Sequence, residues 1–129
     1  MKKNKKGFSF IELIVVIAII AVLSVTAILS YGPSQRKSRD SRRVADLEKI
    51  RMALEMARQI GTTYPATASV KSVLVPNFMQ SYPQDPKTKL DYTYTRLTNY
   101  TYSVGASMED PGSVNITPTG GINYKVFNP

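Results

Sequence analysis

Hydrophobic and polar positions divide the chain into a strongly apolar run near its start and a more polar remainder. In the run Leu13–Leu29, only Ser24 and Thr26 are polar and none is charged. Coiled as a helix, residues 8–31 would extend about 36 Å, enough to cross the roughly 30 Å hydrocarbon core of a membrane. Because the run is apolar on every side, it predicts a helix lying in a membrane or in the core of a large assembly.

A second helical pattern covers residues 32–61. Apolar residues recur every three or four positions, at Leu47, Ile50, Leu54 and Ala57. This spacing predicts an amphipathic helix, with its apolar stripe covered by a small sheet and its end at Gly61.

The pair Gly32-Pro33 separates the two patterns. Pro33 cannot donate a hydrogen bond to the carbonyl of Leu29, and Gly32 loosens the preceding turn. We therefore expect a helix break here, as a kink or as a stretch able to unwind. The alternative is that a membrane helix simply ends at this pair.

Residues 62–129, the head, are rich in Thr, Tyr, Pro, Ser and Asn. One helical turn is expected within residues 70–79, and the two prolines of residues 81–87 predict a loop. Alternation over residues 91–106 predicts an antiparallel hairpin, with Tyr92 and Tyr94 facing Tyr100 and Tyr102 across a turn near Thr98-Asn99. A third strand is expected over residues 122–127. These tyrosines suit either cross-strand packing or a surface-binding patch.

The fold class predicted from these patterns is α+β. A long N-terminal helix, with a hydrophobic half and an amphipathic half, packs against a small antiparallel sheet.

The amino-acid composition excludes several kinds of covalent, catalytic and metal-binding site. The 129 residues include no cysteine and no histidine, and the formal net charge is +8. Disulfides, thiol nucleophiles, Ser-His-Asp triads and the usual zinc sites are therefore excluded. We therefore do not expect an enzyme.

The start of the chain carries its most specific motif. Four lysines within residues 1–6 precede Gly7, Phe8 and an acidic Glu12 at the edge of the apolar run. An ordinary signal peptide, cleaved near Val25-Thr26-Ala27, would gain nothing from this acid. A plain membrane anchor is a second alternative. Cleavage after Gly7 would give Phe8 a protonated α-amine, with which Glu12 of a neighbouring chain could pair and so fix axial register.

The segment Lys5-Lys6-Gly7 followed by Phe8-Ser9-Phe10-Ile11-Glu12-Leu13 resembles the class III signal of type IV pilins and pseudopilins. The resemblance implies that residues 1–7 are a leader, which prepilin peptidase cleaves between Gly7 and Phe8 before methylating the Phe8 nitrogen. It assigns Glu12 to the pairing with a neighbour's N-terminus during assembly. Residues 8–31 then form the transmembrane and filament-core helix, residues 32–61 its amphipathic half, and residues 62–129 the head.

The same resemblance implies where the protein works and with what. The precursor would cross the inner (cytoplasmic) membrane once with its leader in the cytoplasm, and the mature form would join an extracellular or cell-surface filament. The expected function is that of a structural subunit, a major pilin or pseudopilin, of a type IV pilus or a type II secretion-like filament. Partners would be further copies of the chain, prepilin peptidase, and an inner-membrane assembly platform with its ATPase.

Five cations lie within residues 36–43, with Asp40 as the sole acid. The run suits a solvated face, a contact with anionic lipid or a DNA-binding arm, although no aromatic residues are interleaved to stack on bases. The alternative functions are therefore a minor pilin that binds DNA or a surface, and a lone membrane-anchored exoprotein.

Calcium is the one cofactor that the resemblance suggests. The pattern Tyr-Pro-x-Asp-Pro, then Tyr-x-Tyr, then Tyr-Ser-Val-Gly-Ala resembles the major pseudopilins of type II secretion, which bind calcium in the loop after the second strand. Here that loop is Ser107–Ser113, in which Glu109 and Asp110 supply carboxylate oxygens. These two acids form the candidate calcium site, and an ordinary polar turn is the alternative. No other cofactor is expected.

Overall fold

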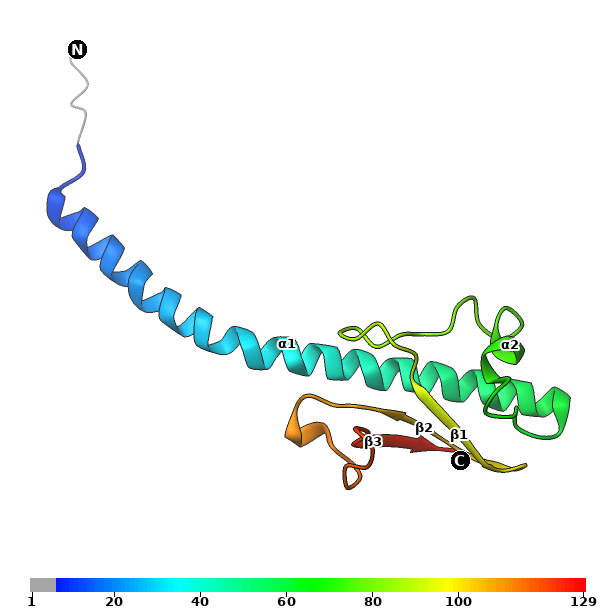
Figure 1. Cartoon of the computed structure of the whole chain (residues 1–129). Coiled ribbons are helices and arrows are strands. Elements are labelled where there is room, and N and C mark those ends of the chain that lie inside the picture. The colour runs from blue at the N-terminus through cyan, green and yellow to red at the C-terminus, as the bar shows by residue number, and fades with distance from the viewer. Residues whose placement is uncertain (1–6) are drawn as a thin grey trace, which may run out of the picture. The chain divides into compact units, whose positions relative to one another are not determined.

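The computed structural model describes residues 7–129 (Figure 1). In chain order its elements are α1 (Phe10–Gly61), α2 (Val70–Leu74), β1 (Thr93–Thr98), β2 (Thr101–Ala106), η1 (Pro111–Ser113) and β3 (Tyr124–Phe127). The leader expected over residues 1–7 lies outside the described residues, apart from Gly7. The α+β class is confirmed, since one long helix is joined to one small antiparallel sheet.

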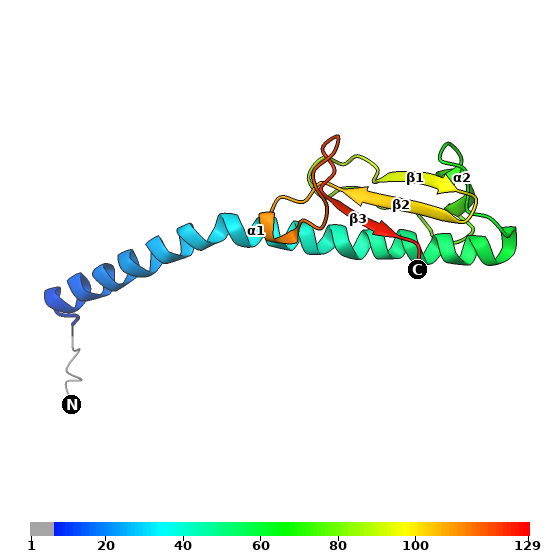
Figure 2. The same cartoon turned by 90° about the horizontal axis from the view of Figure 1, so that it is seen from below.

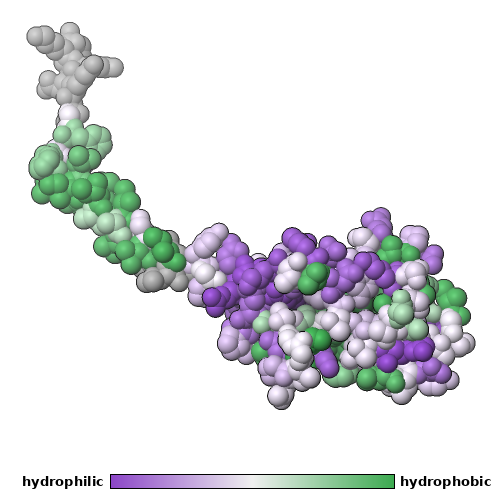
Figure 3. Space-filling model, in the orientation of Figure 1, coloured by the Kyte–Doolittle hydropathy of each residue, from purple (hydrophilic) through white to green (hydrophobic). Residues whose placement is uncertain are grey.

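The chain forms two compact units, one ending at Gln35 and the other running from Arg36 to Pro129. The first unit is helical from Phe10 and encloses no core. Every described large apolar side chain from Phe8 to Ile28 is exposed, by fractions between 40% and 86%. In Figure 3 these residues form a hydrophobic surface. A surface of this kind requires cover from outside the chain.

Within residues 7–129, no helix combines the length and hydropathy that a membrane crossing requires, so the span predicted over residues 8–31 is not confirmed.

Helix α1 continues through Gly32 and Pro33 without interruption. The alternative that the helix ends at this pair is therefore wrong. Proline removes one backbone donor, and the helix on either side retains its own hydrogen bonds. Across the pair, the side-chain amide of Gln35 donates to the Tyr31 hydroxyl at 2.9 Å. Unwinding at Gly32 and Pro33 stays a prediction.

The second unit has a core between α1 and the sheet, which lies along the C-terminal part of this helix (Figure 2). The predicted stripe supplies the helix side of the core, because Leu47, Ile50 and Leu54 are fully buried. The sheet supplies Tyr94, Tyr102 and Val104, and the segment after α1 supplies Tyr64 and Leu74. The helix periodicity therefore identified the packing face correctly.

The sheet has the order β1-β2-β3 and is antiparallel throughout, as the sequence predicts. The register corrects one detail of the hairpin. Tyr94 pairs with Val104 and Tyr102 with Arg96, whereas Tyr100 lies in the turn and is 59% exposed. Tyr92, Tyr94 and Tyr102 are buried, so they serve packing and not a surface patch.

On each edge of the sheet, a side chain occupies backbone groups at one position. On β1, the Arg96 amide donates to the hydroxyl of Thr67 at 3.0 Å. On β3, the Asn115 side chain makes two hydrogen bonds to the backbone of Lys125. It accepts from the backbone amide at 2.9 Å and donates to the backbone carbonyl at 2.8 Å. At Arg96 and Lys125, backbone groups that an open edge would present to another strand are thus occupied within the chain.

Helix α1 ends at Gly61 as predicted, but the left-handed residue is the next one. Thr62 has φ of 62°, an uncommon conformation for a β-branched residue. Its amide donates to the Arg58 carbonyl at 2.8 Å and its hydroxyl donates to the Gly61 carbonyl at 2.7 Å. These two bonds satisfy carbonyls that a helix end leaves unpaired.

Candidate functional site

The proposed processing residues lie just before α1. Gly7 and Phe8 are exposed and non-helical, and the helix begins two residues later at Phe10. A peptidase requires an extended and accessible peptide, so the position of the Gly7–Phe8 bond suits cleavage. Cleavage and methylation themselves stay predictions.

Glu12 lies in the first turn of α1, where a negative charge suits the positive end of the helix dipole. Its side chain is exposed and makes no ion pair within residues 7–129. Lys5 and Lys6, the nearby cations in the sequence, lie outside the described residues. The described part of the chain therefore supplies no cation to Glu12, and a partner from another chain stays a prediction.

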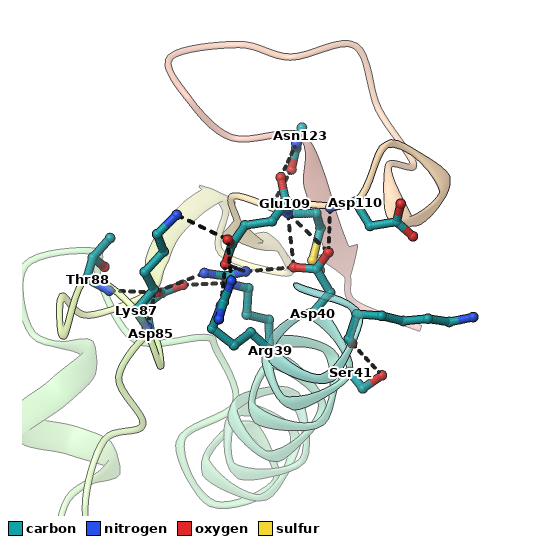
Figure 4. Close-up of polar contacts among 12 residues, drawn as sticks. Arg39, Asp40, Ser41, Asp85, Lys87, Thr88, Glu109, Asp110 and Asn123 are labelled. Atoms are coloured by element: carbon teal, nitrogen blue, oxygen red, sulfur yellow. Dashed lines mark hydrogen bonds and ion pairs between the residues drawn. The ribbon is translucent and has the colours of Figure 1, made fainter. Parts of the chain in front are cut away.

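The strongest electrostatic site of the second unit is centred on Arg43 of α1, whose side chain is only 2% exposed. Three carboxylates surround its guanidinium (Figure 4). Asp40 accepts at 2.6 Å, Glu109 at 2.9 Å, and Asp85 accepts two hydrogen bonds at 2.5 and 3.1 Å. The Asp85 pair is bidentate, which fixes direction as well as distance. Together with Arg39 and Lys87, these residues are called the Arg43 cluster.

The carboxylates of the cluster also hold backbone. Asp40 accepts from the amides of Glu109 and Asp110, at 3.0 and 2.8 Å. Asp85 accepts from the amides of Lys87 and Thr88, both at 2.8 Å. One turn of α1 thereby fastens two loops that are separated by the hairpin in sequence.

Outer cations complete the charge balance around Glu109. Its carboxylate accepts two hydrogen bonds from Arg39, at 2.7 and 2.8 Å, and one from Lys87 at 3.1 Å. The hydrogen bond from Arg39 is the main reason that the pKa of Glu109 lies well below its usual range. At neutral pH this side chain is an anion enclosed by three cations.

Asp85 and Arg43 are also held in their ionised forms. Burial opposes ionisation of Asp85, but hydrogen bonds from Arg43 and from the Thr88 and Lys87 amides prevail and lower its pKa to about 2. Burial also opposes the charge on Arg43, and hydrogen bonds to Asp85, Asp40 and Glu109 raise its pKa nonetheless. A buried arrangement of this kind depends on every member, because a lost partner leaves a desolvated charge.

The candidate calcium site is not supported by this geometry. Glu109 directs its oxygens to Arg39, Arg43 and Lys87, so guanidinium and ammonium groups occupy the positions that a cation would need. Asp110 contributes its amide to Asp40, and its carboxylate points away from Glu109 (Figure 4). Among the described residues, no group of three metal-binding side chains comes together.

The basic run 36–43 divides between two roles. Arg39 and Arg43 are used inside the Arg43 cluster, so the expectation that the whole run is a solvated face or a DNA-binding arm is wrong for these two residues. Arg36, Lys37 and Arg42 are exposed and make no ion pair within the described residues.

A second polar site lies in the core, and sequence reasoning missed it. Glu55 of α1 accepts from the hydroxyls of Tyr64, at 2.8 Å, and Tyr102, at 3.1 Å. The two rings meet edge to face with centroids 4.5 Å apart. Burial is the main reason that the pKa values of both tyrosines are raised. The arrangement binds the helix to β2 and to the segment after α1, and it serves packing.

Comparison with protein families gives one match. Residues 2–28 match the family model described as the prokaryotic N-terminal methylation motif. This motif is the class III signal of type IV pilins and pseudopilins, and it indicates a pilin-like structural protein. Comparison with curated proteins and with solved structures gives no match. The match covers Gly7, Phe8 and Glu12 and leaves out the whole second unit.

Proposed function

We propose that this chain, which carries the class III signal, is a structural subunit of a type IV pilus or a type II secretion-like filament. The precursor is inserted in the inner membrane, cleaved after Gly7 and methylated at Phe8. An inner-membrane platform and its ATPase then assemble it into a filament of many copies. The role is structural, and the chemical work belongs to those partners.

The observation that carries the proposal is the surface of the first unit. Its described large apolar side chains from Phe8 to Ile28 are exposed on all sides of the helix. No other described part of the chain covers them, and burial of apolar surface stabilises association at roughly 25 cal/mol per Å². A bundle of such helices from many copies supplies the missing cover.

Glu12 gives the bundle its register. A carboxylate carried into an apolar bundle is costly unless a cation meets it, and the α-amine of a neighbouring Phe8 is the cation that cleavage creates. Misplaced subunits leave this carboxylate unpaired. Assembly is then selective for one axial offset, and contacts between unlike patches propagate as an open helix.

The test is the intact mass and N-terminal sequence of the protein recovered from its own cells, together with the yield of sheared filaments. The proposal expects a chain that begins at N-methylated Phe8. We expect Glu12→Ala to insert and be processed normally while its filament yield falls at least about tenfold, as a lost buried ion pair requires. Glu12→Asp, which keeps the charge, is the control. A chain that begins near Ile28, or one that keeps Met1, would overturn the proposal.

A further inference from the structure

The acids of the second unit are almost all used inside it. Of its eight acidic residues, seven accept side-chain hydrogen bonds from the described residues, namely Asp40, Asp46, Glu48, Glu55, Asp85, Asp91 and Glu109. Asp110 is the exception, since its carboxylate makes no hydrogen bond or ion pair within residues 7–129. In Figure 4 this side chain extends away from the Arg43 cluster. It lies in the Asp110 loop, residues 109–113, whose Pro111 and Gly112 are exposed.

Three cations, two of them without an ion pair within the described residues, line a pocket elsewhere on the second unit. This pocket, the Arg42 pocket, has a volume of about 640 Å³ and is lined by Arg42, Lys71 and Lys89, with no acid in its lining. Lys71 donates to Asp91 at 2.6 Å, whereas Arg42 and Lys89 make no ion pair within the described residues. Lys89 has φ of 61°, in the left-handed region. A second groove of about 520 Å³, whose lining includes Asp46, shares with the pocket Arg42, Gln80, Ser81, Pro83 and Gln84, so Arg42 lies where the two hollows meet.

The pocket and the Asp110 loop lie on different sides of α1. The amide of Asp110 is held by Asp40, and Asp40 and Arg42 are two residues apart on one helix. Two residues correspond to about 200° of rotation about the helix axis. The rotation separates Asp110 from Arg42, and within the described residues Asp110 makes no ion pair with Arg42 or Lys89. Two complementary patches that face different ways are what a head-to-tail contact between copies requires.

We propose that the Arg42 pocket binds the Asp110 loop of a neighbouring copy of this chain. Arg42 and Lys89 would pair with the partner's Asp110 carboxylate, and the exposed turn at Pro111 and Gly112 would enter the hollow. This inference rests on the proposed filament. In that filament the apolar helices would hold the copies together, and the contact at the Arg42 pocket would orient their second units. Charge pairs at such contacts set orientation and exclude wrong registers.

A nucleic acid is the other polyanion that would suit free cations. The pocket offers no exposed aromatic face for base stacking, because its one aromatic residue, Tyr82, is 8% exposed. The self-contact is favoured because the same chain carries both a matching acid and the pocket. Nucleic acid remains an outcome of the test.

The first test reverses charges in the full-length protein expressed in its own cells. Arg42→Glu and Asp110→Arg should each lower filament yield about tenfold, because like charges then face each other across the contact. The double variant should recover most of the yield. Lys125→Glu, which changes an unpaired cation on β3 outside the pocket, is the matched control and should leave the yield unchanged.

The second test uses the absence of cysteine from the chain. Arg42→Cys combined with Asp110→Cys creates the sole two thiols, and a bifunctional maleimide applied to filaments should give a ladder of covalent multimers. Thr95→Cys combined with Asp110→Cys keeps one partner and moves the other to an exposed position of β1; it should give no ladder. Each single-cysteine variant should stay monomeric.

The outcomes separate the contact from the filament itself. Filaments of normal yield in both single charge reversals, or no ladder from the Arg42→Cys and Asp110→Cys pair, would overturn the contact and leave the proposed function standing. Absence of any filament from the wild-type chain would overturn the proposed function. Binding of double-stranded DNA is compared between wild-type filaments and Arg42→Glu filaments by the mobility shift of the DNA. If the Arg42→Glu filaments form normally but no longer shift the DNA that wild-type filaments shift, the pocket binds nucleic acid and the self-contact is wrong.

Discussion

The two units of the chain differ in where their side chains find partners. From Phe8 to Ile28 the first unit exposes every described large apolar side chain, and Glu12 has no ion pair within the described residues. The second unit buries its apolar stripe against a sheet and encloses Arg43 among three carboxylates. The stability of a single molecule therefore reports on the second unit, whereas in the proposed filament the first unit would be covered by neighbouring copies.

Spectroscopy can follow the second unit alone. Seven of the eight tyrosines lie in it, only Tyr31 lies outside, and the chain has no tryptophan. Near-UV circular dichroism of the full chain in detergent micelles thus reports the packing of the second unit. Denaturant titrations followed by near-UV circular dichroism therefore measure the free energy of unfolding of the second unit, and variants in either unit can be compared by it.

The largest effect should come from Arg43→Met. The substitution keeps much of the aliphatic volume but leaves buried Asp40 and Asp85 without their cation, which should lower the free energy of unfolding by about 3–5 kcal/mol. Arg36→Met removes an exposed arginine with no ion pair in the described chain and should change it by less than about 0.5 kcal/mol. Equal denaturation midpoints for the two variants would show that the Arg43 cluster does not stabilise the second unit.

A matched pair of leucines should separate the two units next. Leu54→Ala opens a cavity in the core and should lower the free energy of unfolding by about 2–5 kcal/mol. Leu13→Ala changes a side chain that is 57% exposed and should alter it by less than about 0.5 kcal/mol, while still reducing filament yield. A large loss of monomer stability in Leu13→Ala would mean that the first unit has intramolecular packing.

Acid should weaken the second unit in a defined window. The pKa of Asp85 is about 2 in the folded chain against 3.8 ordinarily, so its ionised form is favoured by folding. The corresponding stability, about 2 kcal/mol, is complete above pH about 5 and is lost as the pH falls toward 2. Glu109, with a pKa lowered mainly by Arg39, acts in the same direction. Unfolding free energies measured from pH 7 downward check this, and Asp85→Asn should flatten the slope.

The smallest expected changes in the free energy of unfolding come from removing single tyrosine hydroxyls in the second unit. Tyr102→Phe removes a hydrogen bond to Glu55 and should lower the free energy of unfolding by about 1 kcal/mol. The Tyr82 hydroxyl is buried and has no hydrogen-bond partner among the described residues. Tyr82→Phe should therefore be neutral or slightly stabilising. If Tyr82→Phe proved as destabilising as Tyr102→Phe, a partner for the Tyr82 hydroxyl would have to exist in solution.

Local patterns explain what could be predicted from the sequence. The period of Leu47, Ile50 and Leu54 identified the buried side of the helix correctly. The alternation around Tyr92 and Tyr94 placed them on one face of the hairpin, and the structure shows that this face is buried. The continuation of α1 through Pro33 could not be read from the sequence, because proline weakens a helix without always ending it.

The Arg43 cluster shows where such reasoning fails. The spacing of Asp40 and Arg43 places them on neighbouring positions of one helix face, which was the only local signal. Asp85 and Glu109 follow Arg43 by 42 and 66 residues, and only the tertiary fold brings them together. Without that knowledge Glu109 resembled a calcium ligand, since its three cationic partners could not be seen.

The hydrogen bonds at the two edges of the sheet bear on whether strands of neighbouring copies could pair in the proposed filament. A filament holds many identical domains at very high local concentration, the condition under which bare strands fuse into cross-β aggregates. Thr67 on one edge and Asn115 on the other occupy backbone groups that such fusion would use. In the proposed filament, strand pairing at Arg96 or Lys125 would first have to break these hydrogen bonds within the chain, so contacts through side chains are favoured there.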